Sequence, residues 1–258
     1  MRNLKQALAN NDTIVGTWCN SGSPIIAELL ASCGFDYVCV DVEHSAVDLP
    51  QTQQLFQAIT AGSPNCAPMV RLHGVDYSLV KRYVDAGARG VVCPLITTKA
   101  EAELLVSAVK YPPHGKRGVG FCRANRFGLR LAEEFVAANE EVLIAVQIEH
   151  IDAVNNIDEI LSVPGVDAVF IGPYDLTASM GITAQFEHPD YLEARDRILQ
   201  ACQKHKIVAG IHVVQPNTEE LLKRSAEGYR FLAYSLDITM LMHTCTAGVA
   251  QLRSFLAK

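Results

Sequence analysis

The sequence predicts a single (β/α)₈ (TIM) barrel over residues 1–258, and three observations favour this fold. Short β-branched runs alternate with amphipathic segments along the whole chain, which is typical of a parallel sheet connected by helices. Eight such runs occur, and eight units in about 250 residues match the usual barrel. No shift in composition divides the chain. An open doubly wound sheet is the alternative, but Trp18–Ser23, after the first run, lacks a nucleotide-binding fingerprint.

Each predicted strand is an apolar run that ends at a polar, glycine or proline residue. In chain order the eight strands are expected at Thr13–Trp18, Tyr37–Val40, Ala67–Arg71, Gly90–Cys93, Val142–Ile148, Ala168–Ile171, Ile207–His212 and Phe231–Tyr234. The fifth and sixth runs are almost continuously apolar. This pattern indicates parallel strands that are buried on both faces.

Helix start and stop signals lie between the predicted strands. Proline in a first turn, capping side chains and closing glycines mark these helices. The expected helices are Ile25–Cys33 after Pro24, Tyr77–Ala86 capped by Asp76, a helix opened by the Thr98/Glu101 capping box, Ile151–Leu161, and Pro216–Ala226 ended by Gly228.

Composition narrows the class of protein. With 49% hydrophobic and 19% charged residues, the chain reads as a soluble globular protein. A net charge of −6 without a basic stripe argues against a nucleic-acid partner. No apolar run approaches the roughly 20 residues that cross a bilayer, and the polar, helix-like Met1–Asp12 does not resemble a signal peptide. The eight scattered cysteines are expected to be reduced thiols in a cytoplasmic protein.

One connection departs from the pattern. Residues 111–128 form a long loop rich in glycine and arginine between the fourth and fifth strands. Long loops in compact domains are usually functional or disordered. Arg117, Arg123 and Arg126 suit anionic groups, so a cationic lid or a subunit contact is favoured over a solvated excursion.

Polar and aromatic side chains gather at the carboxyl ends of the predicted strands, where barrel enzymes place their active sites. Taken singly, each is weak evidence: a lone histidine is more often structural, and Asp175 could simply cap a helix that begins at Leu176. Their appearance at one end of one barrel is what predicts a site. The residues are Trp18, Asp41, Glu43, His44, Arg71, Gln147, Glu149, Gly172, Pro173, Tyr174 and Asp175.

Two of these residues suggest a metal. Glu149 and Asp175 follow the fifth and sixth strands, so both acids should emerge at the same edge of the sheet. Carboxylates beside a core are costly without a partner, and two of them call for a cation. All-oxygen ligation favours a hard divalent ion such as Mg²⁺ or Mn²⁺.

The segments Asp41-x-Glu43-His44, Val70-Arg71, Gln147-x-Glu149 and Gly172-Pro173-x-Asp175, with Gly118-Val-Gly120, resemble the metal-dependent class II pyruvate aldolases. That family includes 4-hydroxy-2-oxoheptanedioate and 2-dehydro-3-deoxyglucarate aldolases. The resemblance extends over nearly the whole chain. It implies a (β/α)₈ barrel, a divalent metal (Mg²⁺ or Mn²⁺, with Co²⁺ as a further candidate) on Glu149 and Asp175, His44 as the acid/base group and Arg71 as the enolate stabiliser. It also implies a homohexamer in which a neighbouring subunit completes each site.

The expected reaction is retro-aldol cleavage of a non-phosphorylated 2-oxo-4-hydroxy acid to pyruvate and an aldehyde through a metal-stabilised enolate. Metal chelation and Arg71 would stabilise the developing oxyanion, and no lysine suits a Schiff base. Histidine exchanges protons near neutral pH, which suits His44, and Asp41 is expected to fix the tautomer of that ring. Glu43 either orients a water or faces solvent. Trp18, Gln147, Gly172, Pro173 and Tyr174 are expected to contact substrate.

Some residues depart from the aldolase pattern and affect the aldehyde half of the prediction. Tyr174 is bulky where a small residue is expected, and Phe121-Cys122 places larger side chains in the arginine-rich loop. Two other functions stay open, of which only the first follows from these departures. One is a different metal-enolate reaction, such as citrate synthase-like condensation of oxaloacetate with an acyl-CoA. The other is a non-catalytic barrel that binds an oxo acid without turnover.

Overall fold

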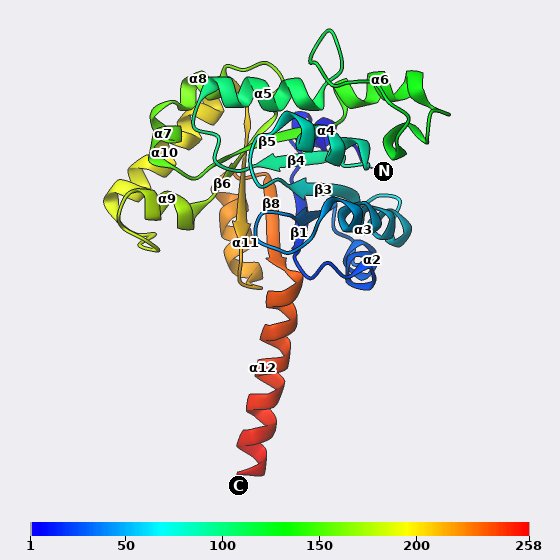
Figure 1. The fold of residues 1–258 in the computed structure, drawn as a ribbon. Coiled ribbons are helices and arrows are strands. Elements are labelled where there is room, and N and C mark those ends of the chain that lie inside the picture. Colours follow the sequence, from blue (N-terminus) through cyan, green and yellow to red (C-terminus); the bar gives the residue numbers. More distant parts are fainter. Residues whose placement is uncertain (1, 258) are drawn as a thin grey trace.

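The computed structural model describes residues 2–257 and shows eight parallel strands that close into a barrel, each paired with its neighbour in chain order (Figure 1). Strand β8 pairs with β1 and so completes the ring. The strands are β1 Ile14–Cys19, β2 Tyr37–Asp41, β3 Ala67–Arg71, β4 Gly90–Cys93, β5 Leu143–Ile148, β6 Ala168–Ile171, β7 Val208–Val213 and β8 Phe231–Leu236. The predicted fold and all eight strands are confirmed, and β3, β4 and β6 have the predicted bounds.

Helices surround the barrel. They are α1 Leu4–Ala9, α2 Pro24–Ser32, α3 Leu49–Gly62, α4 Tyr77–Asp85, α5 Lys99–Val109, α6 Leu131–Glu140, α7 Ile151–Asn155, α8 Ile157–Leu161, α9 Pro173–Ser179, α10 Pro189–His205, α11 Thr218–Ala226 and α12 Asp237–Leu256, with a short 3₁₀ turn at Arg123–Asn125. None of these helices is both long and apolar enough to cross a bilayer.

Two of the predicted helix starts are confirmed in atomic detail. Asp76 accepts a hydrogen bond from the backbone N–H of Leu79 at 2.9 Å and so caps α4. Thr98 and Glu101 form the reciprocal capping box that opens α5. Such caps satisfy N–H groups that have no partner within the helix.

The predicted helix Ile151–Leu161 is wrong in its continuity. The chain forms two short helices, α7 and α8, which meet at Asn156. The Asn156 side chain donates to the backbone carbonyl of Thr97 at 2.9 Å. Asparagine readily exchanges helical bonds for such contacts with neighbouring backbone, and this contact ties the break to the loop after β4.

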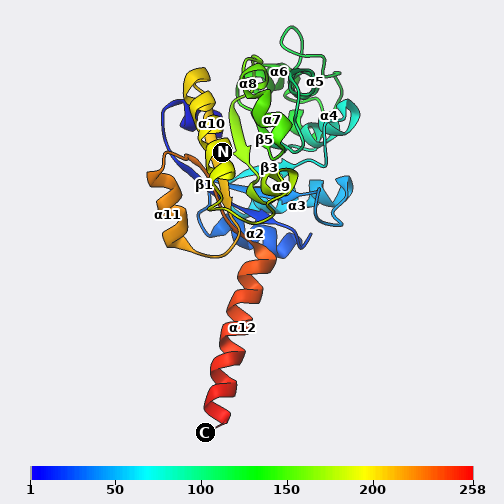
Figure 2. The same cartoon turned by 90° about the vertical axis from the view of Figure 1, so that its left-hand side faces the viewer.

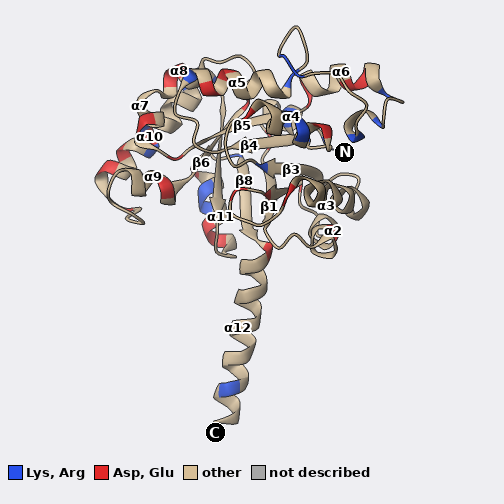
Figure 3. Ribbon diagram, viewed as in Figure 1, with Lys and Arg blue, Asp and Glu red and all other residues tan. Residues whose placement is uncertain are grey.

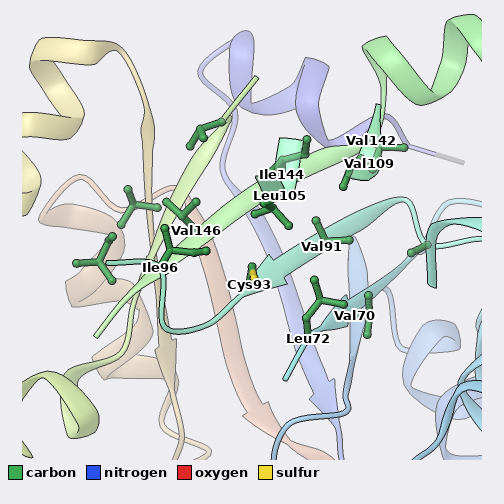
Figure 4. Close-up of a cluster of buried hydrophobic side chains, with 14 of the residues drawn as sticks. Val70, Leu72, Val91, Cys93, Ile96, Leu105, Val109, Val142, Ile144 and Val146 are labelled. Carbon is green, nitrogen blue, oxygen red and sulfur yellow. The ribbon is translucent and has the colours of Figure 1, made fainter. Parts of the chain in front are cut away.

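Two hydrophobic layers hold the fold together. Inside the barrel, side chains such as Ile14, Met69 and Phe170 pack in the core, and Leu4 and Leu8 of α1 join them. Outside, the opposite faces of the strands pack on the helices. Figure 4 shows Val91, Ile144 and Val146 of β4 and β5 beside Leu105 of α5 in this outer layer. A parallel strand covered on both faces explains the nearly continuous apolar runs in the sequence.

No residue of the loop at 111–128 lines the cavity at the carboxyl ends of the strands, so the predicted lid is wrong for this chain's own site. Arg117 is buried, stacks on the Tyr111 ring at 4.4 Å and donates to Asp85 at 2.7 Å. Arg123 donates to the carbonyl of Ala86 at 3.1 Å. These contacts fix the loop against the end of α4, because an arginine fork binds planar acceptors well.

The last helix leaves the barrel altogether. Both views show α12 projecting away from the other elements (Figures 1 and 2). Only its first residue, Asp237, is buried. In a (β/α)₈ barrel the helix after each strand normally packs back on the sheet, so this chain does not use its eighth helix to cover its own β8.

Candidate active site

A cavity of about 100 Å³ opens at the carboxyl ends of the strands, and we call it the mouth cavity. Each odd-numbered strand sends one side chain into its lining: Trp18 from β1, Arg71 from β3, Gln147 from β5 and His212 from β7. Side chains from alternate strands form layers in barrels of this kind. Gly172, Pro173, Tyr174 and Asp175 complete the wall after β6.

Three of these side chains form a stack. The Arg71 guanidinium lies 4.2 Å from the centre of the Trp18 ring. On the same ring the His212 imidazole stacks at 4.8 Å with an interplanar angle of 15°. Cation–π and ring-stacking contacts fix the orientation of the groups involved, so the stack sets the direction of both Arg71 and His212.

Asp41 and Arg71 form a bidentate ion pair beside the cavity. Arg71 donates from Nε and Nη2 to the two carboxylate oxygens at 2.9 and 2.6 Å, and its Nη1 lies 3.1 Å from Glu43 Oε2. Burial alone would raise the pKa of Asp41, but the hydrogen bonds and charge of Arg71 outweigh it and lower that pKa. Asp41 is therefore an anion that positions Arg71.

This pairing changes the expected role of Asp41. Its Oδ1 accepts the backbone N–H of His44 at 3.3 Å, and no hydrogen bond within residues 2–257 joins it to the His44 ring. The ring is instead 3.8 Å from Glu43, and the His44 side chain is 63% exposed. The expected control of the His44 tautomer by Asp41 is thus not what the structure shows. His44 stays at the edge of the site, outside the cavity lining.

The Glu149 side chain is buried and lies against the Gln147 amide. One carboxylate oxygen accepts the backbone N–H of Leu95 at 2.7 Å, and the other contacts the Gln147 amide. Leu95 has a left-handed backbone (φ 56°), a conformation that is uncommon outside glycine. Burial raises the pKa of Glu149, opposed by these two hydrogen bonds, and Asp175 raises it further. No arginine or lysine within residues 2–257 forms an ion pair with either acid.

Gly172 and Asp175 place the second acid next to the first. Helix α9 begins at Pro173 with Gly172 as its N-cap, so Asp175 lies within the first turn and does not cap a helix starting at Leu176. A Cβ atom at Gly172 would lie 2.9 Å from Glu149 Oε2. A larger residue would therefore fill the space in front of this carboxylate, which glycine leaves open.

Buried polar atoms without partners gather around this site. Trp18 Nε1, Asn20 Oδ1 and Gln147 Oε1 are all buried and lack a hydrogen-bond partner within the described chain. Buried polar groups are normally satisfied, so each such atom requires an explanation. A bound ligand with its water supplies one. No set of three or more His, Cys, Asp or Glu side chains in residues 2–257 forms a metal site, and two acids leave coordination positions for substrate.

The structure adds three residues that sequence reasoning did not select. Asn20 donates to Asp41 at 2.7 Å, Leu95 holds Glu149 through its backbone, and His212 stacks on Trp18. Of these three, only His212 could have been selected from the sequence, because it is the last residue of a predicted strand. A backbone donor such as Leu95 leaves no mark in the side-chain sequence.

A family model described as HpcH/HpaI aldolase/citrate lyase matches residues 15–244. The chain belongs to this family. Among similar proteins, a hydroxypyruvate/pyruvate aldolase from Sagittula stellata is 39% identical over 96% of both chains. A 4-hydroxy-2-oxovalerate aldolase from Rhodococcus jostii is 36% identical over 97% of this chain and 96% of that protein.

The fold agrees with this membership. The crystal structure of a HpcH/HpaI aldolase/citrate lyase family protein from Burkholderia cenocepacia has a TM-score of 0.92 and 34% identity, and the match covers 98% of this chain and 100% of that one. As a member of the HpcH/HpaI family with aldolases as relatives, the chain is a carbon–carbon lyase. The predicted resemblance to the class II pyruvate aldolases is confirmed.

Proposed function

We propose that this HpcH/HpaI protein cleaves a non-phosphorylated 2-oxo-4-hydroxy acid into pyruvate and an aldehyde. The observation that carries the proposal is the position of Glu149 and Asp175. These two acids have no cationic partner in residues 2–257 and lie beside a cavity whose floor contains Arg71 and Gln147. An acidic pair next to a cationic oxyanion donor suits enolate chemistry better than simple binding.

The residues present fit a divalent cation. Glu149 and Asp175 are both hard oxygen donors, burial makes the Glu149 charge costly without a cation, and Gly172 leaves open the space before its carboxylate. When bound, Mg²⁺ or Mn²⁺ would withdraw charge from the keto oxygen of the oxo acid and so make carbanion character at C3 accessible.

The chain's own side chains divide the remaining work. Arg71 directs two of its five N–H groups at Asp41, and its Nη1 also lies 3.1 Å from Glu43 Oε2. The remaining N–H groups can donate to the substrate oxygen on which negative charge develops. Trp18 Nε1 can donate to an oxygen of the oxo acid, and the unpartnered Gln147 Oε1 can accept a hydrogen bond from the C4 hydroxyl. Tyr174 forms the wall nearest the aldehyde portion.

In the cleavage direction a base removes the proton of the C4 hydroxyl. The C3–C4 bond then breaks, C4 becomes the aldehyde carbonyl, and its electron pair passes to C3, which takes a proton to give the methyl group of pyruvate. His44 is assigned both proton transfers. Its exposed ring can exchange protons with solvent, while Glu43, whose pKa is raised mainly by burial, adjoins that ring.

We also propose that the protein works as a homo-oligomer, with the hexamer implied by the family resemblance. Exposed apolar residues recur along α12 at helical spacing: Ile238, Leu241, Met242, Val249, Leu252, Phe255 and Leu256. Figure 3 shows almost no charge on this helix. Such a stripe normally packs on a partner, and a neighbouring copy is the proposed one. Phe121 and Phe127 of the loop at 111–128 and the adjacent Leu129 are exposed as well.

We propose a cytoplasmic location, and the eight free cysteines agree with it.

The decisive experiment measures pyruvate release from a panel of 2-oxo-4-hydroxy acids, before and after removal of metal by a chelator. We expect turnover that disappears with the chelator and returns with Mn²⁺ or Mg²⁺. The same samples receive oxaloacetate with acetyl-CoA. Citrate formation without pyruvate release would favour the alternative condensation, and binding of pyruvate without any turnover would favour a non-catalytic barrel.

A further inference from the structure

Asp237 is the first residue of α12 and, within residues 2–257, the one buried residue of that helix. Its carboxylate accepts three backbone N–H groups. Oδ1 accepts those of Asn20 and Ile238, each at 2.9 Å, and Oδ2 accepts that of Ser21 at 3.0 Å. The helix dipole also favours a carboxylate in the first turn. One side chain therefore fastens the start of α12 to the loop that follows β1.

Asn20 connects this fastening to the active site. Its backbone N–H is held by Asp237, and its side-chain Nδ2 donates to Asp41 Oδ2 at 2.7 Å. Arg71 Nη2 donates to the same oxygen at 2.6 Å. Both donors meet at one oxygen of a fully buried carboxylate, and charge-assisted hydrogen bonds of this kind are strong and directional. A displacement of Asn20 therefore moves the oxygen that orients the guanidinium.

A second contact joins the same part of the chain to Arg71. Ser235, two residues before Asp237, has a left-handed backbone (φ 49°), and the pairing of β8 with β1 shifts register beside it. Its carbonyl accepts a hydrogen bond from His212 Nε2 at 2.8 Å. The His212 ring stacks on Trp18, which also contacts the guanidinium. Burial lowers the pKa of His212 to about 4, so the neutral ring lies in this stack without repelling Arg71.

The two acids of the proposed metal site do not share these contacts. Glu149 is held by partners on β5 and on the loop after β4, and Asp175 lies in the first turn of α9. Within residues 2–257, no hydrogen bond joins either acid to Asn20 or Asp237. A disturbance at the start of α12 is therefore expected to reach Arg71 and to leave the paired acids in place.

From these contacts we propose that Asp237 is a positioning residue for Arg71, and that the direction of the guanidinium depends on how α12 is oriented relative to the barrel. The inference rests on the proposed aldolase function and adds a control of the same site to it. A chain whose α12 is displaced keeps its paired acids but loses part of its oxyanion stabilisation. The neighbouring copy proposed to pack on α12 is thereby connected to the reaction without touching the substrate.

The first test is a double-mutant cycle. Asp237→Asn keeps the size of the side chain but replaces one acceptor oxygen with a donor NH₂ group, whereas Asn20→Ala removes the donor to Asp41 and leaves α12 unchanged. We expect each variant to lower kcat for pyruvate formation about tenfold, with KM within about threefold, because each weakens a hydrogen bond to a charged group. In an Arg71→Ala background neither change should lower kcat further. Losses that multiply in that background would overturn the assignment.

Asp76→Asn is the matched control. Asp76 also accepts a backbone N–H at the start of a helix, from Leu79 at 2.9 Å, but the helix is α4. The control should lower the urea midpoint, as Asp237→Asn does, while its kcat stays within about twofold of wild type. Equal losses of kcat in the two variants would show that Asp237 is only structural.

Trp18 reports on the link to α12 without catalysis. It is the only tryptophan in the chain and lies in the stack that holds the guanidinium, and tryptophan emission responds to nearby charge and polarity. Emission is recorded in metal-free protein without substrate. We expect Asp237→Asn to shift it, and charges on the exposed apolar face of α12, in Leu241→Glu/Leu252→Glu, to shift it in the same direction. The combined variant should shift it no further, and Ala247→Glu should leave it unchanged.

Unchanged emission in Asp237→Asn or in Leu241→Glu/Leu252→Glu, or shifts that add in the combined variant, would overturn the dependence on α12. Exchange of pyruvate C3 protons by the wild-type protein in D₂O tests the proposed function separately. Its absence would defeat that function, whereas exchange together with additive emission shifts would defeat only this inference.

Discussion

Arg71 donates two parallel hydrogen bonds to the Asp41 carboxylate, from Nε at 2.9 Å and from Nη2 at 2.6 Å. Asn20 and two backbone N–H groups also donate to Asp41, so the carboxylate is held on several sides. Arg71 is thus preorganised before any substrate arrives. Preorganised donors stabilise developing charge without rearranging at the moment of reaction.

Arg71→Ala is expected to lower kcat for pyruvate formation by about two to three orders of magnitude, as loss of one oxyanion donor does. Arg71→Lys keeps the charge but not the fork that matches Asp41, and we expect it to recover only part of the loss. Steady-state kinetics on both variants measure kcat and KM separately. A change confined to KM would contradict the assigned role.

Asp41→Asn should act through Arg71. Removing one partner of a buried ion pair costs about 3–5 kcal/mol, so we expect a lower urea midpoint together with a reduced kcat. The folded-state pKa of Asp41 lies below its usual value of 3.8, so the pair's contribution to stability is complete above pH 3.8 and is lost as pH falls through the folded-state pKa.

Urea unfolding of wild type and Asp41→Asn across acidic pH measures this contribution directly. The difference between the two proteins should shrink as the pH falls below 3.8. If the difference grew on acidification instead, the ion pair would not be its source.

Glu149→Gln is expected to abolish metal-dependent turnover, because one remaining carboxylate holds a divalent ion poorly. Titration calorimetry with Mn²⁺ should show no binding at the concentration that saturates wild type. The metal-free variant should be at least as stable as metal-free wild type, since it no longer buries an unpaired charge. Glu159→Gln, on the exposed side of α8, is the matched control and should bind Mn²⁺ normally. Activity retained by Glu149→Gln after metal stripping would refute the assignment.

Charges placed on the apolar stripe of α12 should weaken the oligomer. We expect the double variant Leu241→Glu/Leu252→Glu to elute with a smaller molar mass by light scattering than wild type. Ala247→Glu puts the same charge on the opposite face of the helix and should leave the mass unchanged. A monomeric wild-type protein, or equal effects of both changes, would exclude the proposed role of the stripe.

The barrel could be predicted from sequence because hydrophobic periodicity is a local signal. Runs such as Ala168–Ile171 are apolar enough that their bounds follow directly. The break at Asn156 could not be predicted in this way, because it depends on a contact with Thr97, which belongs to a different loop.

The site was predictable to the extent that strand order brings residues together. Arg71, Gln147 and Asp175 meet in one cavity because parallel strands end at one edge. The partners of each side chain were not predictable: Asp41 could bind His44 or Arg71, and the register of β2 against β3, which places Asp41 opposite Arg71, decides between them. The direction of α12 was not predictable either, because the local signals that predict a helix do not say what it packs against.

The mouth cavity draws its floor from both halves of the barrel. Arg71 and Gln147 stand on β3 and β5 beside the paired acids, whereas Trp18 and His212 stand on β1 and β7. Because the Trp18 ring contacts both Arg71 and His212, a substitution at Trp18 would move the guanidinium on β3 as well as the imidazole on β7. The two halves of the floor are thus mechanically linked through one indole ring, and substitutions in either half have to be judged by their effect on the other.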